Sequence, residues 1–205
     1  MKFYNSIGPN PGTVRMFIAE KGLDLPRVEI DLRGGENRRA PYTSVNPAGQ
    51  TPALELDDGS AITEITAICE YLDEIGPGPS LIGATPEARA NTRMWVRRID
   101  LNICEPMTNG FRFAEGLGLF KDRVHTIPQA ADDLKAVARE HLAWLDGLVA
   151  GRSFIAGDQI TLADVLLYAF LTFGARVGQP LDPANRNLSA WYERINARPS
   201  AGAAN

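Results

Sequence analysis

The stretch NPAGQTPALELDDGSAITEIT, residues 46–66, decides the fold of this chain. Its first residues form a loop rich in proline and glycine, and Thr51-Pro52 then precedes the alternating run 53–56. Proline at the first residue of a strand loses no ladder hydrogen bond, and X–Pro bonds in turns are where cis peptides occur. Residues 57–60, DDGS, predict a hairpin turn before a second short strand at 61–62. Apolar residues at helical spacing follow: Ile65, Ile68, Cys69 and Leu72.

The last part of this stretch predicts a ligand site, because its helix begins near Thr63-Glu64. The N-terminus of a helix presents unpaired N–H groups and positive partial charge, which suit a carboxylate. The exposed backbone beside Thr51-Pro52 suits a peptide-like ligand. Together these features predict a site for a peptide-like molecule that carries a carboxylate.

The residues before this stretch complete a small α/β unit. Residues 2–5 predict a strand, a helix follows the glycine- and proline-rich loop at 8–12 and ends near Lys21-Gly22, and 27–32 alternate as a second strand. A polar, basic loop at 34–39 leads into the opening stretch. The order β-α-β, loop, β-β-α is typical of a thioredoxin-like domain, which we place at residues 1–77.

The remaining residues predict an all-helical domain. Proline and glycine concentrate at 76–80, and strand patterns are almost absent beyond them, so we place a linker at 78–86 and the second domain at 87–205. Thr161 and Asp164 predict a capping box before a buried helix. The expected segments are a helix from Thr85-Pro86-Glu87 that bends or ends at Pro106, an irregular segment at 111–120, helices at 128–149, 165–173 and 185–197, and a frayed tail at 200–205.

Composition narrows the function classes. The 205 residues carry a formal net charge of -4, which argues against nucleic acid or an anionic membrane as a general partner. No run of 18 apolar residues and no signal-peptide pattern is present, so a cytoplasmic location is expected. Cys69 and Cys104 stand far apart without a CxxC or metal-ligand spacing, which favours two buried thiols and no metal site.

In this order and spacing, the segments resemble the soluble glutathione S-transferases over nearly the full chain. The first domain is similar to their glutathione-binding domain through QTPAL at 50–54 and TEITAI at 63–68. The second is similar to their helical domain through G-x-x-x-T-x-A-D at 157–164. The resemblance implies glutathione as co-substrate, an electrophile pocket in the second domain, and a homodimer.

The resemblance also assigns glutathione contacts to particular residues. Thr51, before Pro52, is expected to pair its main chain with the cysteinyl part, and Glu64 with Ile65 is expected to hold the γ-glutamyl end. Ile65 stands where the family usually has serine, so binding there loses a hydroxyl, which Thr66 partly replaces. Further contacts implied by the resemblance are Arg38 and Gln50 at the glycine carboxylate, and Asp100 across a dimer at the γ-glutamyl amine.

The group that activates the glutathione thiol departs from the family pattern. The usual serine or cysteine position falls among Gly8, Pro9 and Asn10, where no hydroxyl stands. We therefore expect Asn10, with the start of the following helix, to lower the pKa of the thiol, and Ser6 as the second candidate. Tyr4 is expected to be a core residue of its strand.

Two readings of function remain open at this point. The first is transfer of glutathione to a small hydrophobic electrophile, with Phe111 and Arg112 lining the electrophile pocket, and peroxidase, dehalogenase or isomerase activity as variants. The alternative is a binding or interaction protein of the same fold that has lost turnover, which Ile65 and the missing hydroxyl favour. Glu64, Pro52 and Arg38 argue for a retained ligand site, because folding does not need them.

Overall fold

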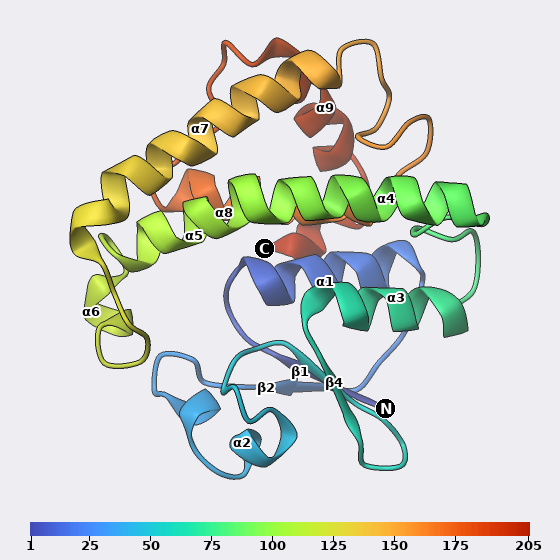
Figure 1. The fold of residues 1–205 in the computed structure, drawn as a ribbon. Coiled ribbons are helices and arrows are strands. Elements are labelled where there is room, and N and C mark those ends of the chain that lie inside the picture. Colours follow the sequence, from blue (N-terminus) through green and yellow to red (C-terminus); the bar gives the residue numbers. More distant parts are fainter.

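The computed structural model describes residues 1–205, and its first part is a four-stranded sheet with helices (Figure 1). The strands run in the order β2-β1-β3-β4, with β1 parallel to β2 and antiparallel to β3. This arrangement confirms the thioredoxin-like prediction. The elements are β1 (Lys2–Asn5), α1 (Pro9–Glu20), β2 (Arg27–Glu29), a 3-10 turn (Glu36–Arg38), α2 (Tyr42–Val45), β3 (Ala53–Glu55), β4 (Ala61–Thr63) and α3 (Ile65–Ile75).

The register of the sheet brings three separate loops to one edge. Tyr4 pairs with Ala53, and Ala53 pairs with Thr63, in antiparallel ladders. The residues that follow β1, precede β3 and follow β4 therefore lie at the same end of the sheet. Ser6, Thr51-Pro52 and Glu64 meet there because of this register.

The second part is helical, as predicted, and packs over α1 and α3 (Figure 1). Its first helix does not end at Pro106: a π-helical turn shifts the hydrogen bonds just before the proline, and the helix continues to Arg112. The expected irregular segment is also partly wrong, because 117–120 form a short helix. The elements are α4 (Pro86–Ile99), the π turn (Asp100–Cys104), α5 (Glu105–Arg112), α6 (Leu117–Phe120), a 3-10 turn (Pro128–Ala130), α7 (Ala131–Leu148), α8 (Leu162–Arg176) and α9 (Arg186–Asn196).

Helix α8 is the centre of the helical part, and residues 162–171 are all buried. The predicted capping box is present at its start: the Asp164 side chain accepts from the Thr161 N–H at 2.9 Å. Asp164 is fully buried and also accepts from the Trp191 indole N–H at 2.8 Å. One carboxylate therefore ties α8 to α9.

The expected frayed tail is wrong. Residues Ala201–Ala204 form a 3-10 turn whose Ala201 and Ala204 side chains are buried against α1. The approach is close, because a Cβ on Gly12 of α1 would lie 2.4 Å from the Ala204 carbonyl oxygen. Arg15 of α1 fixes the turn by donating to the Ala203 carbonyl oxygen at 2.8 Å. None of the helices is both long and apolar enough to span a membrane.

Candidate functional site

The loop before β3 is held rigidly with its backbone presented at the sheet edge. The Thr51–Pro52 peptide bond is cis, as predicted, and both residues are buried. The preceding Gln50 carbonyl oxygen accepts from the Asn46 side-chain amide at 2.7 Å and from the Tyr42 hydroxyl. The Gln50 side chain is exposed and makes no hydrogen bond, so it is free to contact a ligand.

The start of α3 lies beside this loop and offers hydrogen-bond donors. Glu64 precedes the helix at φ 69°, ψ 126°, an unusual conformation for a residue with a side chain, and its carboxylate is exposed without a partner. The first backbone N–H with an acceptor is that of Ile68, so the N–H groups of 65–67 are unpaired. The start of α3 therefore offers N–H groups that can bind a carboxylate, and the Glu64 carboxylate beside them can bind an amine.

The basic loop and the helical part meet across the same edge. Arg38 is exposed, has no acid partner, and donates only to the Ala48 carbonyl oxygen at 3.3 Å. Arg123, from the segment after α6, donates to the carbonyl oxygens of Leu32 at 2.5 Å and Arg33 at 3.0 Å. Sequence reasoning missed this clamp, which fixes the basic loop beneath the helical part.

The loop from β1 to α1 supplies two candidates for contact with a thiol. Asn10 is the second residue of α1, is half-buried, and makes no side-chain hydrogen bond. Its backbone N–H is also unpaired, whereas the flanking Pro9 and Pro11 have none. Ser6 is 3% exposed, and its Oγ lies 2.5 Å from the Thr51 Oγ1.

The Tyr4 side chain does not belong to the group of loops that contains Ser6, Thr51 and Glu64. Its hydroxyl donates to the Glu55 carboxylate at 2.7 Å, and its ring packs edge-on against Tyr42 at 5.7 Å. The hydrogen bond to Glu55 raises the pKa of Tyr4, so the phenol stays protonated. Tyr4 is therefore a structural residue of the smaller core below the sheet.

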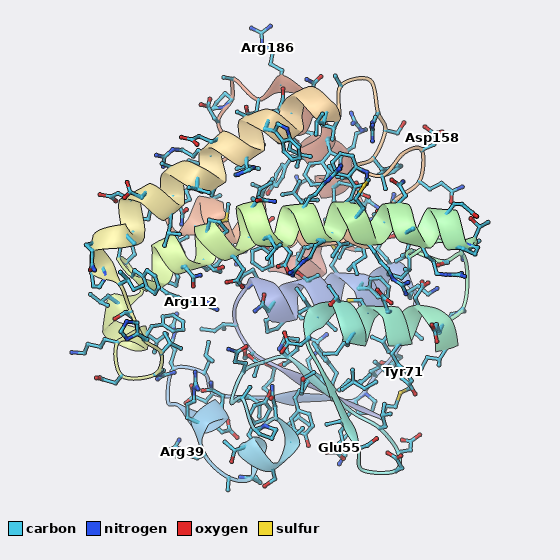
Figure 2. The ribbon with its side chains drawn as sticks, in the orientation of Figure 1. Arg39, Glu55, Tyr71, Arg112, Asp158 and Arg186 are labelled. Carbon is cyan, nitrogen blue, oxygen red and sulfur yellow. The ribbon has the colours of Figure 1, made fainter.

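Phe111 and Arg112, the residues predicted for an electrophile pocket, lie in an aromatic cluster at the end of α5. The Phe111 ring contacts Phe173 of α8 at 5.2 Å and Phe120 of α6 at 6.2 Å, both edge-on. The Arg112 guanidinium lies over the Phe120 ring at 5.7 Å and donates to the Asn109 side chain at 3.0 Å. Burial lowers the pKa of Arg112, and the Arg38 charge lowers it further. Figure 2 shows Arg112 on the side of α5 that faces the first domain.

Asp100 lies near the start of α3 within the same chain. It lines a cavity of about 190 Å³ together with Thr66 and Arg97 of the same chain. Burial raises the pKa of Asp100, and the charges of Glu105 and Glu64 raise it further. Asp100 and Thr66, the second residue of α3, thus line one cavity within one protomer. Its predicted contact across a dimer stays a prediction.

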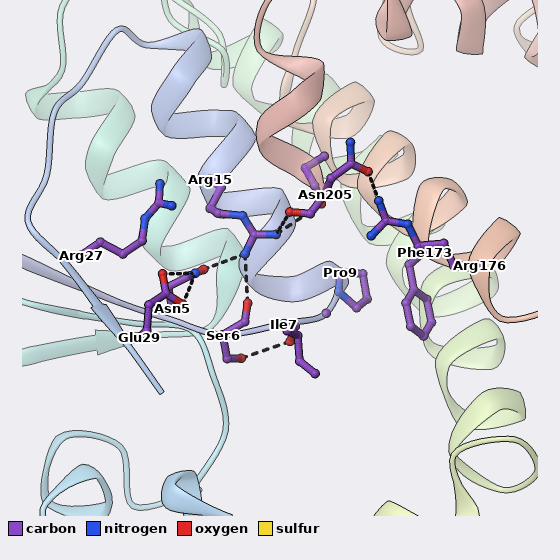
Figure 3. A pocket seen from close by; sticks show the side chains of 12 residues that line it. Asn5, Ser6, Ile7, Pro9, Arg15, Arg27, Glu29, Phe173, Arg176 and Asn205 are labelled. Atoms are coloured by element: carbon purple, nitrogen blue, oxygen red, sulfur yellow. Dashed lines mark hydrogen bonds between the residues drawn. The ribbon is translucent and has the colours of Figure 1, made fainter. Parts of the chain in front are cut away.

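A second cavity, of about 260 Å³, lies beside the β1–α1 loop (Figure 3). Its walls are residues 6–9, the edge strand β2, the end of α8 and the C-terminal turn. Sequence reasoning missed it because residues from both ends of the chain form it. A buried arginine, Arg15, among the apolar residues of α1 was the available signal. No three His, Cys, Asp or Glu side chains lie close enough together to hold a metal ion.

Comparison with known proteins gives matches over almost the whole chain. The model of the glutathione S-transferase N-terminal domain matches residues 8–75, and that of the C-terminal domain matches residues 117–199. Glutathione S-transferase 2 of Saccharomyces cerevisiae is 34% identical over 94% of this chain and 84% of the yeast protein.

Solved structures of similar proteins also match nearly the whole chain. A glutathione S-transferase domain-containing protein of Marinobacter aquaeolei is 37% identical, with a TM-score of 0.92, over 98% of this chain and 100% of that one. The Gtt2 structure of Saccharomyces cerevisiae is 32% identical, with a TM-score of 0.93, over 100% of both chains.

Proposed function

The chain belongs to the glutathione S-transferase family, and from this premise we propose how it holds glutathione and activates the thiol. Glutathione is the co-substrate of this family. The γ-glutamyl carboxylate binds the free N–H groups at the start of α3, and the Glu64 carboxylate binds the γ-glutamyl amine. The cysteinyl main chain pairs with Thr51 beside the cis Pro52. The glycine carboxylate meets Arg38 and Gln50.

One observation carries this placement: a strained acidic residue directly before a helix whose first N–H groups are unpaired, beside a cis-proline loop. Holding Glu64 at positive φ costs on the order of 1–3 kcal/mol, which folding does not require. A zwitterionic amino-acid group uses both features at once, since its carboxylate suits the N–H groups and its ammonium suits Glu64. The γ-glutamyl end of glutathione is such a group.

Retention on immobilised glutathione, followed by a conjugation assay, tests the proposed activity. We expect retention that free glutathione reverses, and conjugation of 1-chloro-2,4-dinitrobenzene faster than the uncatalysed reaction. Retention without turnover supports the binding-protein alternative, which Ile65 in place of serine favours. No retention contradicts glutathione as the ligand.

The thiol lies, in this proposal, at the start of α1. A free cysteine-type thiol has a pKa near ~8.5, and a helix N-terminus or a hydrogen-bond donor lowers it. Asn10 offers both an unpaired backbone N–H and an unpaired side-chain amide. Ser6 is the weaker candidate, because its buried hydroxyl already contacts Thr51 and the Ile7 carbonyl oxygen.

Asn10→Ala is expected to raise the apparent pKa of the bound thiol by about one unit, which is tenfold less thiolate below that pKa. Because the thiolate is the nucleophile, kcat/KM falls near neutral pH and recovers at alkaline pH. Asn10→Asp adds a charge that stabilises the helix but repels the thiolate, so its melting temperature rises while the thiol pKa rises further. The pH profile of kcat/KM, recorded for the wild type, Asn10→Ala and Asn10→Asp, measures the pKa of the thiol in each protein. If Ser6→Ala shifts the pH profile and Asn10→Ala does not, Ser6 and not Asn10 lowers the pKa of the thiol.

The electrophile in this proposal is a small hydrophobic molecule that lies against Phe111 and Arg112, next to the thiol. The thiolate attacks the electrophilic carbon, the C–S bond forms, and the leaving group departs with its bonding electrons. Proximity of the two bound reactants supplies much of the acceleration. A role in detoxification, a cytoplasmic location and a homodimer belong to the same proposal, and the exposed Met94 and Leu101 are candidates for the dimer contact.

A further inference from the structure

The cavity beside the β1–α1 loop carries an excess of positive charge. Arg15, Arg27 and Arg176 line it, and Glu29 is the acidic side chain among its walls. Neither Arg27 nor Arg176 forms an ion pair. Glu29 instead accepts from the Asn5 side-chain amide, at 2.8 Å to each carboxylate oxygen. Arg27 and Arg176 therefore line the cavity without an acidic partner.

The three arginines have different tasks. Arg15 is buried and already bonded, to the Asn5 side chain at 2.7 Å, the Ser6 carbonyl oxygen at 3.0 Å and the Asn205 carbonyl oxygen at 2.7 Å. The Arg15 side chain is therefore a fixed part of the cavity wall. Arg27 is exposed and makes no hydrogen bond, and Arg176 bonds only the Asn205 side chain. Figure 3 shows Arg27 and Arg176 on opposite sides of Arg15. Arg27 is free to contact a ligand, and Arg176 is held only by the uncharged Asn205 amide, which a carboxylate can replace.

The position of the cavity connects it to the reaction. Residues Ser6–Pro9 form one of its walls and lead directly into Asn10, where the thiol is placed. Phe173 lines the cavity and also contacts Phe111 of the aromatic cluster at 5.2 Å. Sites for whole small ligands are usually larger, about 300–1,000 Å³, so this cavity suits one part of a ligand.

We propose that this cavity is a subsite for an acidic substituent of the electrophile, so that the substrates of this protein are aromatic or apolar molecules that carry a carboxylate. The apolar body lies on Phe111 and Phe173, and the carboxylate enters the cavity that Arg27 and Arg176 line. Guanidinium groups bind carboxylates through paired hydrogen bonds, and neither Arg27 nor Arg176 has an acidic partner in the protein. This inference rests on the proposed glutathione transfer, and it adds the chemical class of the second substrate.

A matched pair of electrophiles tests the inference: 4-chloro-3,5-dinitrobenzoate and 4-chloro-3,5-dinitrobenzamide. In both, the glutathione thiolate attacks the ring carbon that bears chlorine, the C–S bond forms, and chloride leaves with the bonding pair. Each kcat/KM is divided by the rate of the uncatalysed reaction, which removes the difference in intrinsic reactivity. We expect the protein to prefer the acid by about tenfold, as for charge-assisted contacts in a partly exposed site.

Two double variants separate the cavity from the overall charge of the protein. Arg27→Gln with Arg176→Gln removes the two guanidinium groups of the cavity that lack an acidic partner, and the preference should fall to about twofold or less, since only Arg15 remains. Arg139→Gln with Arg186→Gln removes the same charge from exposed positions on α7 and α9, and the preference should stay. An equal preference in the wild type, a preference retained in the cavity variant, or one lost in the surface variant would overturn the inference.

A binding measurement decides the question without turnover. Calorimetry with 3,5-dinitrobenzoate and 3,5-dinitrobenzamide, which have no leaving group, should show the same preference for the acid and the same loss in the cavity variant. If conjugation and glutathione retention both fail, the proposed transfer is wrong, while this measurement still supports or contradicts the acidic subsite. Equal affinities for the two compounds contradict the subsite even if conjugation is rapid.

Discussion

Glu64→Gln should weaken glutathione binding by about 10–100-fold, because a hydrogen bond to a charged group contributes about 1.5–3 kcal/mol. The change keeps the size of the side chain and removes the charge that pairs with the γ-glutamyl ammonium. Glu64 is exposed and makes no hydrogen bond within the protein, so the melting temperature should hardly change. Titration calorimetry with glutathione measures the loss. Glu74→Gln, an exposed glutamate on the same helix, is the matched control and should bind glutathione like the wild type.

Glu64→Gly separates the ligand role from the backbone conformation. Glycine adopts φ 69° without strain, so the melting temperature of this variant should rise while glutathione binding falls as in Glu64→Gln. Opposite changes in stability and binding identify a residue held in an unfavourable conformation for its ligand. A lower melting temperature in Glu64→Gly, or unchanged affinity in Glu64→Gln, would contradict this role.

Asp164→Ala is expected to lower the free energy of unfolding by about 3–5 kcal/mol, since each buried donor left without a partner costs roughly 1–3 kcal/mol. Asp164 accepts from the Ile155 N–H at 2.8 Å, the Thr161 N–H at 2.9 Å, the Thr161 hydroxyl at 3.0 Å and the Trp191 indole N–H at 2.8 Å. All these donors lose their acceptor together. A loss of that size is a large fraction of the total stability of a domain.

Urea unfolding followed by tryptophan fluorescence measures this loss. Asp158→Ala is the matched control, because Asp158 is an exposed aspartate on the loop before α8 and makes no side-chain hydrogen bond (Figure 2). Its free energy of unfolding should stay within about 0.5 kcal/mol of the wild type. If Asp164→Ala loses less than about 1 kcal/mol, the buried carboxylate does not hold α8 and α9 together.

Local sequence signals predicted most of the fold. The alternation at 53–56 and the DDGS turn predicted the β3–β4 hairpin, and the Thr161 and Asp164 pair predicted the start of α8. The errors lie where distant contacts override local preference. The C-terminal turn is ordered because Arg15, almost the whole chain away in sequence, bonds it. At Pro106 only one of the two expected outcomes is contradicted: the helix does not end, because it continues through the π turn to Arg112.

The candidate site also contains residues that local sequence patterns predicted and contacts that they did not predict. Thr51, Pro52 and Glu64 were predictable, since a proline before a strand and an acid before a helix are local patterns. The contact between Ser6 and Thr51 joins two loops, and no sequence pattern indicates it. The cationic cavity was equally hidden, because Arg27 and Arg176 come from β2 and α8, which are far apart in the sequence. Local sequence patterns therefore predicted the loop before Pro52 and the start of α3, but not the cavity that distant residues form.

A crystal structure with bound glutathione decides whether the tripeptide is held as proposed. We expect the γ-glutamyl carboxylate within about 3.2 Å of the N–H groups at the start of α3, and the γ-glutamyl amine at the Glu64 carboxylate. We also expect the cysteinyl main chain against Thr51 and the sulfur nearer to Asn10 than to the Ser6 hydroxyl. Glutathione bound with its γ-glutamyl end away from Glu64, or with its sulfur far from the start of α1, would show that the proposed placement is wrong.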